Sequence, residues 1–509
     1  MDAPPADKGA EQMKNADANT KEKDSAPIAA PGLDERTPKR DRSSQSKAVP
    51  QFTPAERAAR GKAARAELPR SAHSEWEPAH RRRDPVELLE EQAQARLPDL
   101  GPIRYGRMLV SPFTFFRGGA YLMAADLADG PRTGLYAQLC GDAHLSNFGI
   151  FAATDRRLVF SINDFDETLP GPFEWDVKRL AASIAVAGRD RGFGDASRRS
   201  AVAATVREYR EAMHRFATMR NIDVWYARLD VASIRDQLRA SGKQMKRFQS
   251  NVASVRTKDS IRALTKLCGT VEGELRIVGN PPLVTPIEDV LPGAEQEHLE
   301  DVVRRMMHTY RRTLPNDRRH LIEGYRYVHA ARKVVGVGSV GTRTWILLLI
   351  GRDEGDPLFL QFKEAQASVL EPFLGRSEYG QHGQRVVEGQ RMMQAAPDIT
   401  LGWERIDTID DQTRDFYIRQ LWNSKGSPEV DLMDPPGLEA YGRVCGWTLA
   451  RAHARSGDRI AIAAYLGSGS AFDRAMTSFA EVYADQNERD YRALREAVAS
   501  GRVAAELGV

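Results

Sequence analysis

The sequence predicts an α+β protein with two lobes and a disordered N-terminal tail. At 509 residues the chain is longer than one hydrophobic core supports. Residues 75–330 and 426–509 are predicted to be mainly helical, apart from a loop and a hairpin at 135–167, and the helical spacing of apolar side chains is continuous from 196 to 331. Residues 331–425 instead alternate β-branched and aromatic runs with glycine turns, as strands do. We therefore expect a larger helical lobe, a smaller β-rich lobe, and a helical return from 426 to the larger lobe.

Composition limits the classes of partner and compartment. The 73 basic and 70 acidic side chains give a formal charge of +3, so charge does not favour nucleic acid as the main partner. The three cysteines are too few and too scattered for a disulfide framework or a zinc site. No apolar run is long enough to cross a bilayer, and no signal segment opens the chain. A cytoplasmic protein without a membrane span is expected, and its oligomeric state is not indicated.

The N-terminal quarter contains helix-start signals after a polar tail. Residues 1–50 have almost no large apolar side chains and are predicted to be disordered. Residues 51–74 form a predicted basic helical arm, because Thr53 and Glu56 flank Pro54 as a capping box does. A second start follows at Asp84, so we expect the folded lobe to begin near residue 75.

Most of the candidate chemistry lies on two loops that follow strand-like runs. Asp142 follows the apolar run 135–140, and Asn147 comes five residues later. The run 158–162 then leads to Asp164, and a hairpin would carry this residue back beside Asn147. Their oxygen atoms suit Mg²⁺ held with the phosphates of a nucleotide, while Asp142 could accept a proton. The alternative is an acidic surface hairpin whose Asp and Asn residues only form turns.

This spacing resembles the kinase-like superfamily, in particular its aminoglycoside and choline kinase branch. There a Gly-Asp-x-His-x-x-Asn loop precedes an Asp-Phe metal motif, as Gly141–Asn147 precedes Asp164-Phe165 here. The resemblance implies ATP and Mg²⁺ as cofactors. It also implies Asp142 as catalytic base, Asn147 and Asp164 as Mg²⁺ ligands, and Asp166 as an auxiliary ligand.

A second resemblance covers residues 75–490. Three parts of the chain are similar to a large bacterial family labelled only as domain of unknown function 2252. They are the segment RYGRMLVSPFTFFRGGAYLMAADLADGP, the central loops and the segment GPFEWDVKRLAAS. That family implies no substrate. Within the second segment, Asp176 has two open roles: an N-cap of the following helix, or, as the kinase-like resemblance implies, a residue that holds the backbone of the catalytic loop. From 196 to 331 the pattern predicts helix throughout.

A glycine turn between two strands predicts a phosphate-binding loop. Gly336, Gly338, Ser339 and Gly341 would let backbone N–H groups approach phosphates without obstruction. Lys363 follows on the third strand, where it could reach the α- and β-phosphates. A dinucleotide-binding fold also uses such glycines, but here no helix follows them.

The remaining nucleotide contacts are expected further along the chain. Glu388 is the candidate partner of Lys363, with Glu371 and Glu378 as rivals. Leu421 and Asn423 end a strand and would supply backbone contacts to an adenine ring.

These observations predict a kinase-like enzyme that uses Mg-ATP to phosphorylate a small molecule or, less favoured, a protein. Its partners would be the nucleotide and an unidentified acceptor. The glycine lobe follows the catalytic loop, so the lobe order would be circularly permuted. Three alternatives stay open: an adenylyl transferase of the same fold, a nucleotide-binding regulatory module without turnover, and a metal-dependent hydrolase. The hydrolase would use Asp142, His144, Asp164 and Asp166.

Overall fold

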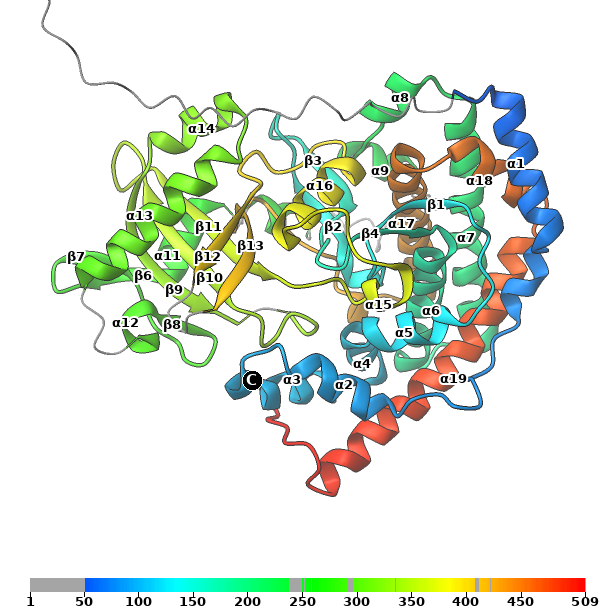
Figure 1. The fold of residues 1–509 in the computed structure, drawn as a ribbon, viewed down its shortest axis with the longest axis horizontal. Helices are drawn as coiled ribbons and strands as arrows, with labels where there is room; N and C mark the ends of the chain where they lie inside the picture. The colour runs from blue at the N-terminus through cyan, green and yellow to red at the C-terminus, as the bar shows by residue number, and fades with distance from the viewer. Residues whose placement is uncertain are drawn as a thin grey trace, which may run out of the picture. The chain divides into compact units, whose positions relative to one another are not determined.

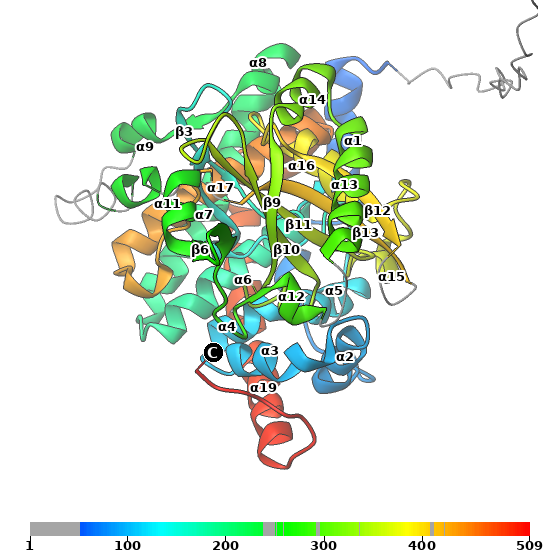
Figure 2. The same ribbon diagram turned by 90° about the vertical axis from the view of Figure 1, so that its left-hand side faces the viewer.

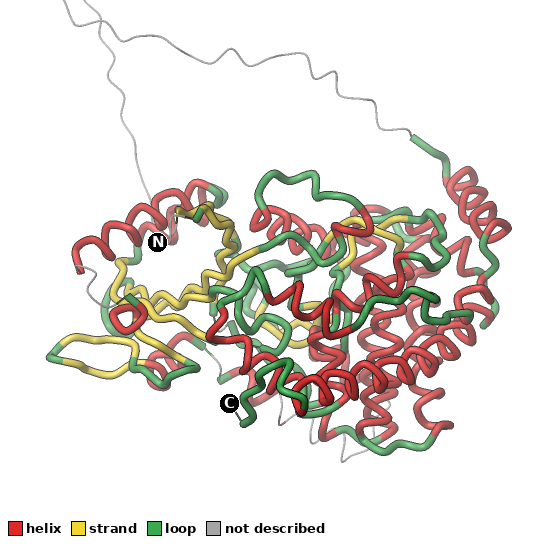
Figure 3. Tube along the Cα trace, turned by 60° about the horizontal axis from the view of Figure 1, so that its bottom comes forward, coloured by secondary structure: helices red, strands yellow, loops and turns green. Residues whose placement is uncertain are grey.

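The computed structural model describes residues 51–237, 250, 252–257, 259–291, 296–334, 336–407, 412–421 and 423–508. The predicted tail, residues 1–50, lies outside the described residues. Phe52–Val509 forms one compact unit, and it combines helices with a sheet, so the predicted α+β class is confirmed. Most strands gather in one part of this unit and most of the long helices in another (Figures 1 and 3).

The N-terminal arm is a helix that packs on the folded body. The helices before residue 240 are α1 (Pro54–Glu67), α2 (Pro85–Ala93), α3 (Gly101–Met108), α4 (Pro112–Gly118), α5 (Ala120–Ala128), α6 (Glu174–Asp190), α7 (Asp195–Thr218), α8 (Asn221–Tyr226) and α9 (Val231–Gln237), with short 3₁₀ helices η1 (Arg70–Ser74), η2 (Pro98–Leu100) and η3 (Leu145–Asn147). The predicted capping box of Thr53 and Glu56 is confirmed at the start of α1. A Cβ on Gly61 would lie 2.0 Å from the carbonyl oxygen of Ala461, so α1 packs tightly on α18. The compact unit therefore begins at Phe52, ahead of the expected start near 75.

The C-terminal helices complete the helical region. The later helices are α11 (Ser260–Leu267), α12 (Ile287–Val290), α13 (Gln296–Arg312), α14 (Asn316–Glu323), α15 (Glu371–Leu374), α16 (His382–Met393), α17 (Pro435–Ser456), α18 (Arg459–Leu466) and α19 (Ala471–Ala499), with the 3₁₀ helix η4 (Val430–Leu432). Helices α6, α7, α17 and α19 pack around one hydrophobic core. After α19 the chain returns to α3, where Glu506 N–H donates to Pro102 O at 2.8 Å (Figure 1). Among the described residues, no helix combines the length and apolar character that crossing a bilayer requires.

An antiparallel sheet of six strands forms the β-rich region. The strands of the whole described chain, of which only some belong to this sheet, are β1 (Tyr136–Leu139), β2 (Phe148–Ala152), β3 (Leu158–Ile162), β4 (Leu169–Pro172), β5 (Leu229–Asp230), β6 (Cys268–Val271), β7 (Glu274–Ile277), β8 (Val284–Pro286), β9 (Arg326–Lys333), β10 (Thr344–Ile350), β11 (Pro357–Ala365), β12 (Gly402–Asp407) and β13 (Thr413–Gln420). The large sheet has the order β12-β13-β11-β10-β9-β8.

Both faces of this sheet are covered. Along β10, Leu347 and Leu349 point into one hydrophobic cluster with α13, while Ile346 and Leu348 point into another with α11. Figure 2 shows α13 and α11 on the two sides of β9 and β10. A strand buried on both faces reads as a continuous apolar run, which is what residues 345–350 show.

The prediction of helix throughout 196–331 is wrong. Strands β5 to β8 and most of β9 lie in this stretch, and β8 and β9 belong to the large sheet. The hairpin of β6 and β7 turns at Glu272 and Gly273, both with positive φ (52° and 85°). These strands are two to eight residues long and lie between helices, so a window long enough to detect helical spacing averages over them.

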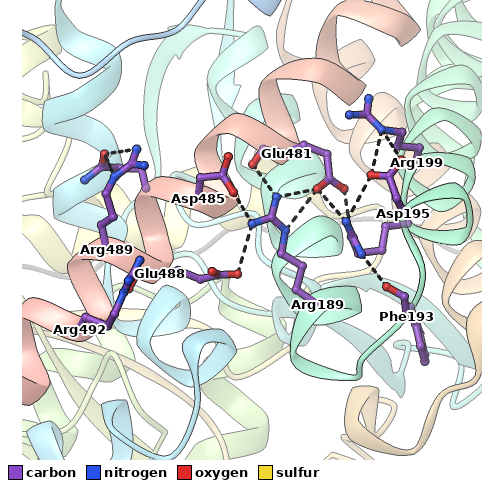
Figure 4. A network of polar contacts seen from close by, with 11 residues as sticks. Arg189, Phe193, Asp195, Arg199, Glu481, Asp485, Glu488, Arg489 and Arg492 are labelled. Atoms are coloured by element: carbon purple, nitrogen blue, oxygen red, sulfur yellow. Dashed lines mark hydrogen bonds and ion pairs between the residues drawn. The ribbon is translucent and has the colours of Figure 1, made fainter.

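A charge network ties α19 to α6 and α7 (Figure 4). Arg189 on α6 lies 2.7 Å from Glu481, 2.6 Å from Asp485 and 3.2 Å from Glu488, all on α19. Arg198 on α7 reaches the second oxygen of Glu481 at 3.2 Å. The Glu481 side chain is only 7% exposed, and two arginines compensate its charge.

Candidate functional site

Helix α6 holds the loop that carries Asp142. Asp176, Arg179 and Ser183 are three and four residues apart, so they lie on one face of α6. Asp176 accepts hydrogen bonds from the two backbone N–H groups before Asp142, at 2.8 and 3.1 Å. Ser183 Oγ accepts from Leu145 N–H at 3.0 Å. Of the two roles left open for Asp176, the structure therefore supports holding the loop, and its side chain does not cap the helix.

Arg179 fixes the carboxylate of Asp142. Its Nε and a terminal nitrogen lie 2.9 and 2.8 Å from Oδ1. Oδ2 lies 3.6 Å from His144 Nε2, beyond hydrogen-bond distance, so Oδ2 is the atom that could take a proton from a ligand. Burial raises the pKa of Asp142 to about 6, although Arg179 opposes the shift. The carboxylate is ionised at neutral pH, and it is more basic than an ordinary Asp.

Asn147 and Asp164 line the same pocket as Asp142. The side-chain nitrogen of Asn147 donates to the backbone oxygen of Asp142 at 2.8 Å, which leaves its carbonyl oxygen to face a cation. Burial alone would raise the pKa of Asp164, but the charges of Lys363 and Arg419 outweigh burial and lower it. One amide oxygen and one ionised carboxylate therefore lie together.

This donor set fits a metal that arrives with phosphates. In the part of the chain that the structure describes, no group of three or more His, Cys, Asp or Glu side chains could hold a metal. Mg²⁺ commonly takes one or two carboxylates and fills its other positions with water and substrate phosphates. Asn147 and Asp164 would hold such an ion, whose charge would neutralise the phosphates.

Asp166 is engaged by protein donors, and its role as an auxiliary metal ligand stays a prediction. Its Oδ1 accepts from Tyr417 Oη at 2.8 Å. Its Oδ2 contacts Lys363 Nζ and lies 3.4 Å from Ser339 Oγ. Asp166 would have to leave these donors before it could bind a metal.

The glycine turn lies between β9 and β10 and reaches this pocket. Gly336, Gly338 and Ser339 line it, and Gly336 has a φ of 71° that favours glycine. Gly341 has a φ of 92° and does not line the pocket. A Cβ there would lie 2.9 Å from Arg96 Cβ, so Gly341 permits a close approach to the segment after α2.

Arginines from the N-terminal helices hold the carbonyl groups of the glycine turn. Arg96 donates to Gly338 O at 2.7 Å and to Val340 O at 2.6 Å. Arg107 on α3 donates to Gly336 O at 2.6 Å. The turn is therefore held from the side of α2 and α3, a contact that no pattern in the sequence predicted.

Lys363 lies on β11, the third strand counted from β9, as predicted. Its Nζ contacts Asp166 beside the pocket. Burial opposes the charge of Lys363, but Asp164 and Asp166 raise its pKa above the ordinary value. The amine therefore stays protonated and faces both carboxylates.

One pocket thus collects the residues from both parts of the chain. Its volume is about 150 Å³, below the roughly 300–1,000 Å³ of pockets that bury drug-sized ligands. A triphosphate could occupy it only with the nucleoside outside, or with the glycine turn displaced. The pocket is lined by polar and charged side chains and by the glycine turn, among them Arg96, Arg117, Asp142, His144, Asn147, Asp164, Asp166, Glu167, Gly336, Gly338 and Ser339.

Glu388 does not pair with Lys363. It lies on α16 and forms an ion pair with Arg391 one turn later, at 2.9 Å. The residue of α16 that reaches the site is Arg385, which donates to the carbonyl oxygens of Asp166 and Thr168. Of the rivals, Glu371 accepts from Ser368 N–H at 3.2 Å. Helix α16 presents a cation to the backbone here, and Asp166 takes the place expected for a glutamate.

Leu421 and Asn423 do not line the pocket. Leu421 N–H donates to Phe359 O at 2.9 Å within the sheet, and the Leu421 side chain is buried in its core. Asn423 pairs with Ala152: its carbonyl oxygen accepts from Ala152 N–H at 3.0 Å, and its side chain donates back at 2.9 Å. The backbone N–H of Leu421 is therefore already bonded and does not face an adenine site.

Several cations near the pocket were not predicted, among them Arg179, Arg117 and Lys425. Arg179 lies one turn after Asp176, a spacing that could have identified it. Arg117 precedes the glycine pair at 118–119, with no pattern that marks it. Lys425 Nζ donates to Asn163 O at 3.0 Å, and burial together with Arg419 lowers its pKa to about 7.

Comparison with known proteins gives a family and no relative of known activity. Residues 96–497 match the family described as "Uncharacterized protein conserved in bacteria (DUF2252)". No curated protein matches the chain, and neither does any solved structure.

Proposed function

We propose that this chain, a member of the bacterial family DUF2252, is a Mg-ATP-dependent phosphotransferase that acts on a small molecule. One observation carries the proposal. The glycine turn and Lys363 of the sheet region meet Asp142, Asn147 and Asp164 of the helical region around one pocket. A site for phosphoryl transfer needs these parts in contact and is indifferent to their order in the chain.

Each part has a distinct task in this proposal. The turn at Gly336 and Gly338 offers backbone N–H groups to phosphates, and Lys363 supplies a fixed positive charge. Asn147 and Asp164 would hold Mg²⁺. Asp142, fixed by Arg179, would accept the proton of the acceptor hydroxyl as it attacks the γ-phosphorus. The reaction would then release ADP and the phosphorylated acceptor.

The arrangement of the sheet supports a kinase-like fold in permuted order. The glycine turn joins β9 to β10, and the lysine follows on β11. Helix α16 comes next, before β12 and β13. Kinases use a glycine-rich loop, a lysine on the third strand and a following helix. The departure is the missing lysine–glutamate pair, because Asp166 contacts Lys363 instead.

A second candidate, adenylyl transfer, is favoured by one observation. Lys363 is paired with Asp166 in the structure and is therefore not committed to one phosphate group. Either the γ-phosphorus or the α-phosphorus of ATP could then face Asp142, and attack at the α-phosphorus would transfer AMP. A regulatory module would use the same pocket without turnover. The hydrolase is the least supported, since no acidic or histidine cluster among the described residues could hold a metal without a nucleotide.

Calorimetric titration of ATP with and without Mg²⁺ tests the proposal. We expect wild type to bind Mg-ATP, Lys363→Ala to bind it at least 10-fold more weakly, and Asp164→Ala to lose the Mg²⁺ dependence. Lys62→Ala, at an exposed position on α1, is the matched control and should bind as wild type does.

Far-UV circular dichroism would establish that each variant is folded. Wild-type affinity for Mg-ATP in both folded site variants would refute the proposed site. Absence of nucleotide binding by wild type would refute the proposed function.

A further inference from the structure

Arg117 is a partly buried arginine on the wall of the pocket, and its Nε has no hydrogen-bond partner among the described residues. It lies near the end of α4 and lines the pocket together with Asp142 and His144. The Nε atom itself is buried. Arg96, the other arginine in the described lining, donates to two carbonyl groups of the glycine turn. The two arginines therefore differ: one holds the protein backbone and the other faces the cavity.

A buried polar group without a hydrogen bond is costly to the folded state, and the cost is greater when the group is charged. A buried carboxyl can avoid that cost by taking up a proton, as Glu404 does with its pKa raised by burial to about 8. Arginine has no such escape near neutral pH. Burial lowers the pKa of Arg117, the charges of Asp142 and Asp431 oppose the shift, and the guanidinium remains charged under physiological conditions. An anionic ligand would relieve the cost.

His144 supplies a second unpartnered polar atom at the same place. Its side chain is 5% exposed, and its Nδ1 is buried without a hydrogen-bond partner. Burial lowers the pKa of His144 well below its ordinary value, and Arg117 and Arg179 add to the shift. The ring is therefore neutral, so one of its nitrogens is a donor and the other an acceptor.

The glycine turn runs over the backbone of Arg117. A Cβ on Gly338 would lie 3.4 Å from the carbonyl oxygen of Arg117. A phosphate held by the N–H groups of this turn would thus lie on the same side of the pocket as Arg117.

We propose that Arg117, with His144 beside it, is an anion subsite that binds a phosphate group next to Asp142. This inference rests on the proposed function and adds its missing cation on the acceptor side. The phosphate would be either the γ-phosphate of the nucleotide or a phosphate already present on the acceptor. Both present the same oxygen atoms to a guanidinium.

Calorimetry on the full chain with Mg²⁺ distinguishes the two sources. One arm compares Mg-ADP with the Mg complex of the β,γ-imido analogue of ATP. If Arg117 binds the γ-phosphate, Arg117→Gln should weaken binding of the analogue 10- to 100-fold and leave ADP unchanged. The second arm titrates inorganic phosphate into analogue-loaded protein. If Arg117 binds the acceptor, wild type should bind phosphate there and Arg117→Gln should not.

Two further variants control for folding and for charge. Arg117→Lys keeps a positive charge and should retain part of the affinity, while Arg60→Gln, at an exposed position on α1, should change neither arm. Since the structure gives Arg117 no hydrogen bond to a described residue through Nε, its replacement should leave the circular dichroism spectrum unchanged.

Unchanged affinity of Arg117→Gln in both arms would overturn the subsite. If wild type binds no nucleotide, the proposed function fails and inorganic phosphate is titrated into the nucleotide-free protein instead. Loss of phosphate binding in Arg117→Gln would then still support the subsite. Equal binding by both proteins, or none by wild type, would refute it.

Discussion

The network that joins α6, α7 and α19 and the pocket beside Asp142 both bury charge, but they compensate it differently. In the network, Arg189 contacts three carboxylates and Glu481 contacts two arginines (Figure 4). In the pocket, Arg117 Nε has no partner, and burial raises the pKa of Asp142 to about 6. Loss of one partner from a compensated pair destabilises the fold, whereas a charged group with an open atom, such as Arg117 Nε or Asp142 Oδ2, is available to a ligand.

The comparison predicts its largest effect at Asp142. We expect Asp142→Asn to retain nucleotide binding and to slow turnover by about 10² to 10⁴, the usual range for loss of a general base. Asn is almost the same size and can still accept a hydrogen bond from Arg179, so the loop should keep its conformation. Steady-state kinetics measures the loss. An unchanged rate would mean that the Asp142 carboxylate serves the structure and not the chemistry.

Removal of one charge from the network should cost stability and leave the pocket unaffected. We expect Glu481→Gln to lower the free energy of unfolding by about 3 kcal/mol, because Arg189 and Arg198 lose their shared buried carboxylate. Denaturant unfolding measures the loss. A variant as stable as wild type would show that the network contributes little to the fold.

Glu404 on β12 tests what happens to an unpaired charge outside the pocket. Its pKa is raised by burial to about 8, and its Oε2 has no partner among the described residues. Between about pH 4.5 and 8 the unfolded chain has an ionised Glu404 and the folded chain a protonated one. The folded state thus binds the extra proton, so this contribution to stability is complete at low pH and is lost as pH rises through 8.

The neutral variant Glu404→Gln should remove this pH dependence. We expect it to unfold with wild-type stability near pH 4.5 and to be more stable by on the order of 2 kcal/mol at pH 8. Thermal unfolding across this pH range measures the difference. Equal stability at pH 8 would mean that Glu404 ionises in the folded protein as it does in water.

The smallest effect is predicted at the edge of the same network. Arg199 pairs with Asp195 at 3.0 Å, and both side chains are exposed (45% and 62%). Such surface pairs contribute about 0–0.5 kcal/mol, so Arg199→Gln should unfold with wild-type stability within error. Destabilisation comparable to that of Glu481→Gln would contradict the distinction between buried and exposed pairs.

Local signals in the sequence predicted local structure well. The cap of α1 at Thr53, the cap of α2 at Asp84 and the hairpin that places Asp164 near Asn147 all follow from turn and cap chemistry within a few residues. The sheet that carries Lys363 was visible because buried strands are continuous apolar runs.

Contacts between distant segments were not predictable in this way. The partner of Lys363 is Asp166, which lies 197 residues before it, and not the predicted Glu388. Arg96 and Arg107 hold a glycine turn more than two hundred residues later. Such pairings depend on how helices and sheet pack, and neither residue spacing nor residue type records that packing. The open Nε of Arg117 is likewise a property of its surroundings.

The proposed activity of this protein is transfer of the γ-phosphoryl group of ATP to a small acceptor bound in this pocket. Mass spectrometry of the products formed from Mg-ATP and a bacterial metabolite extract tests it most directly, with Asp142→Asn as the control. We predict ADP together with a metabolite heavier by one phosphoryl group, formed by wild type and not by the variant. Pyrophosphate with a metabolite that carries AMP, or ATP left unchanged by wild type, would contradict it.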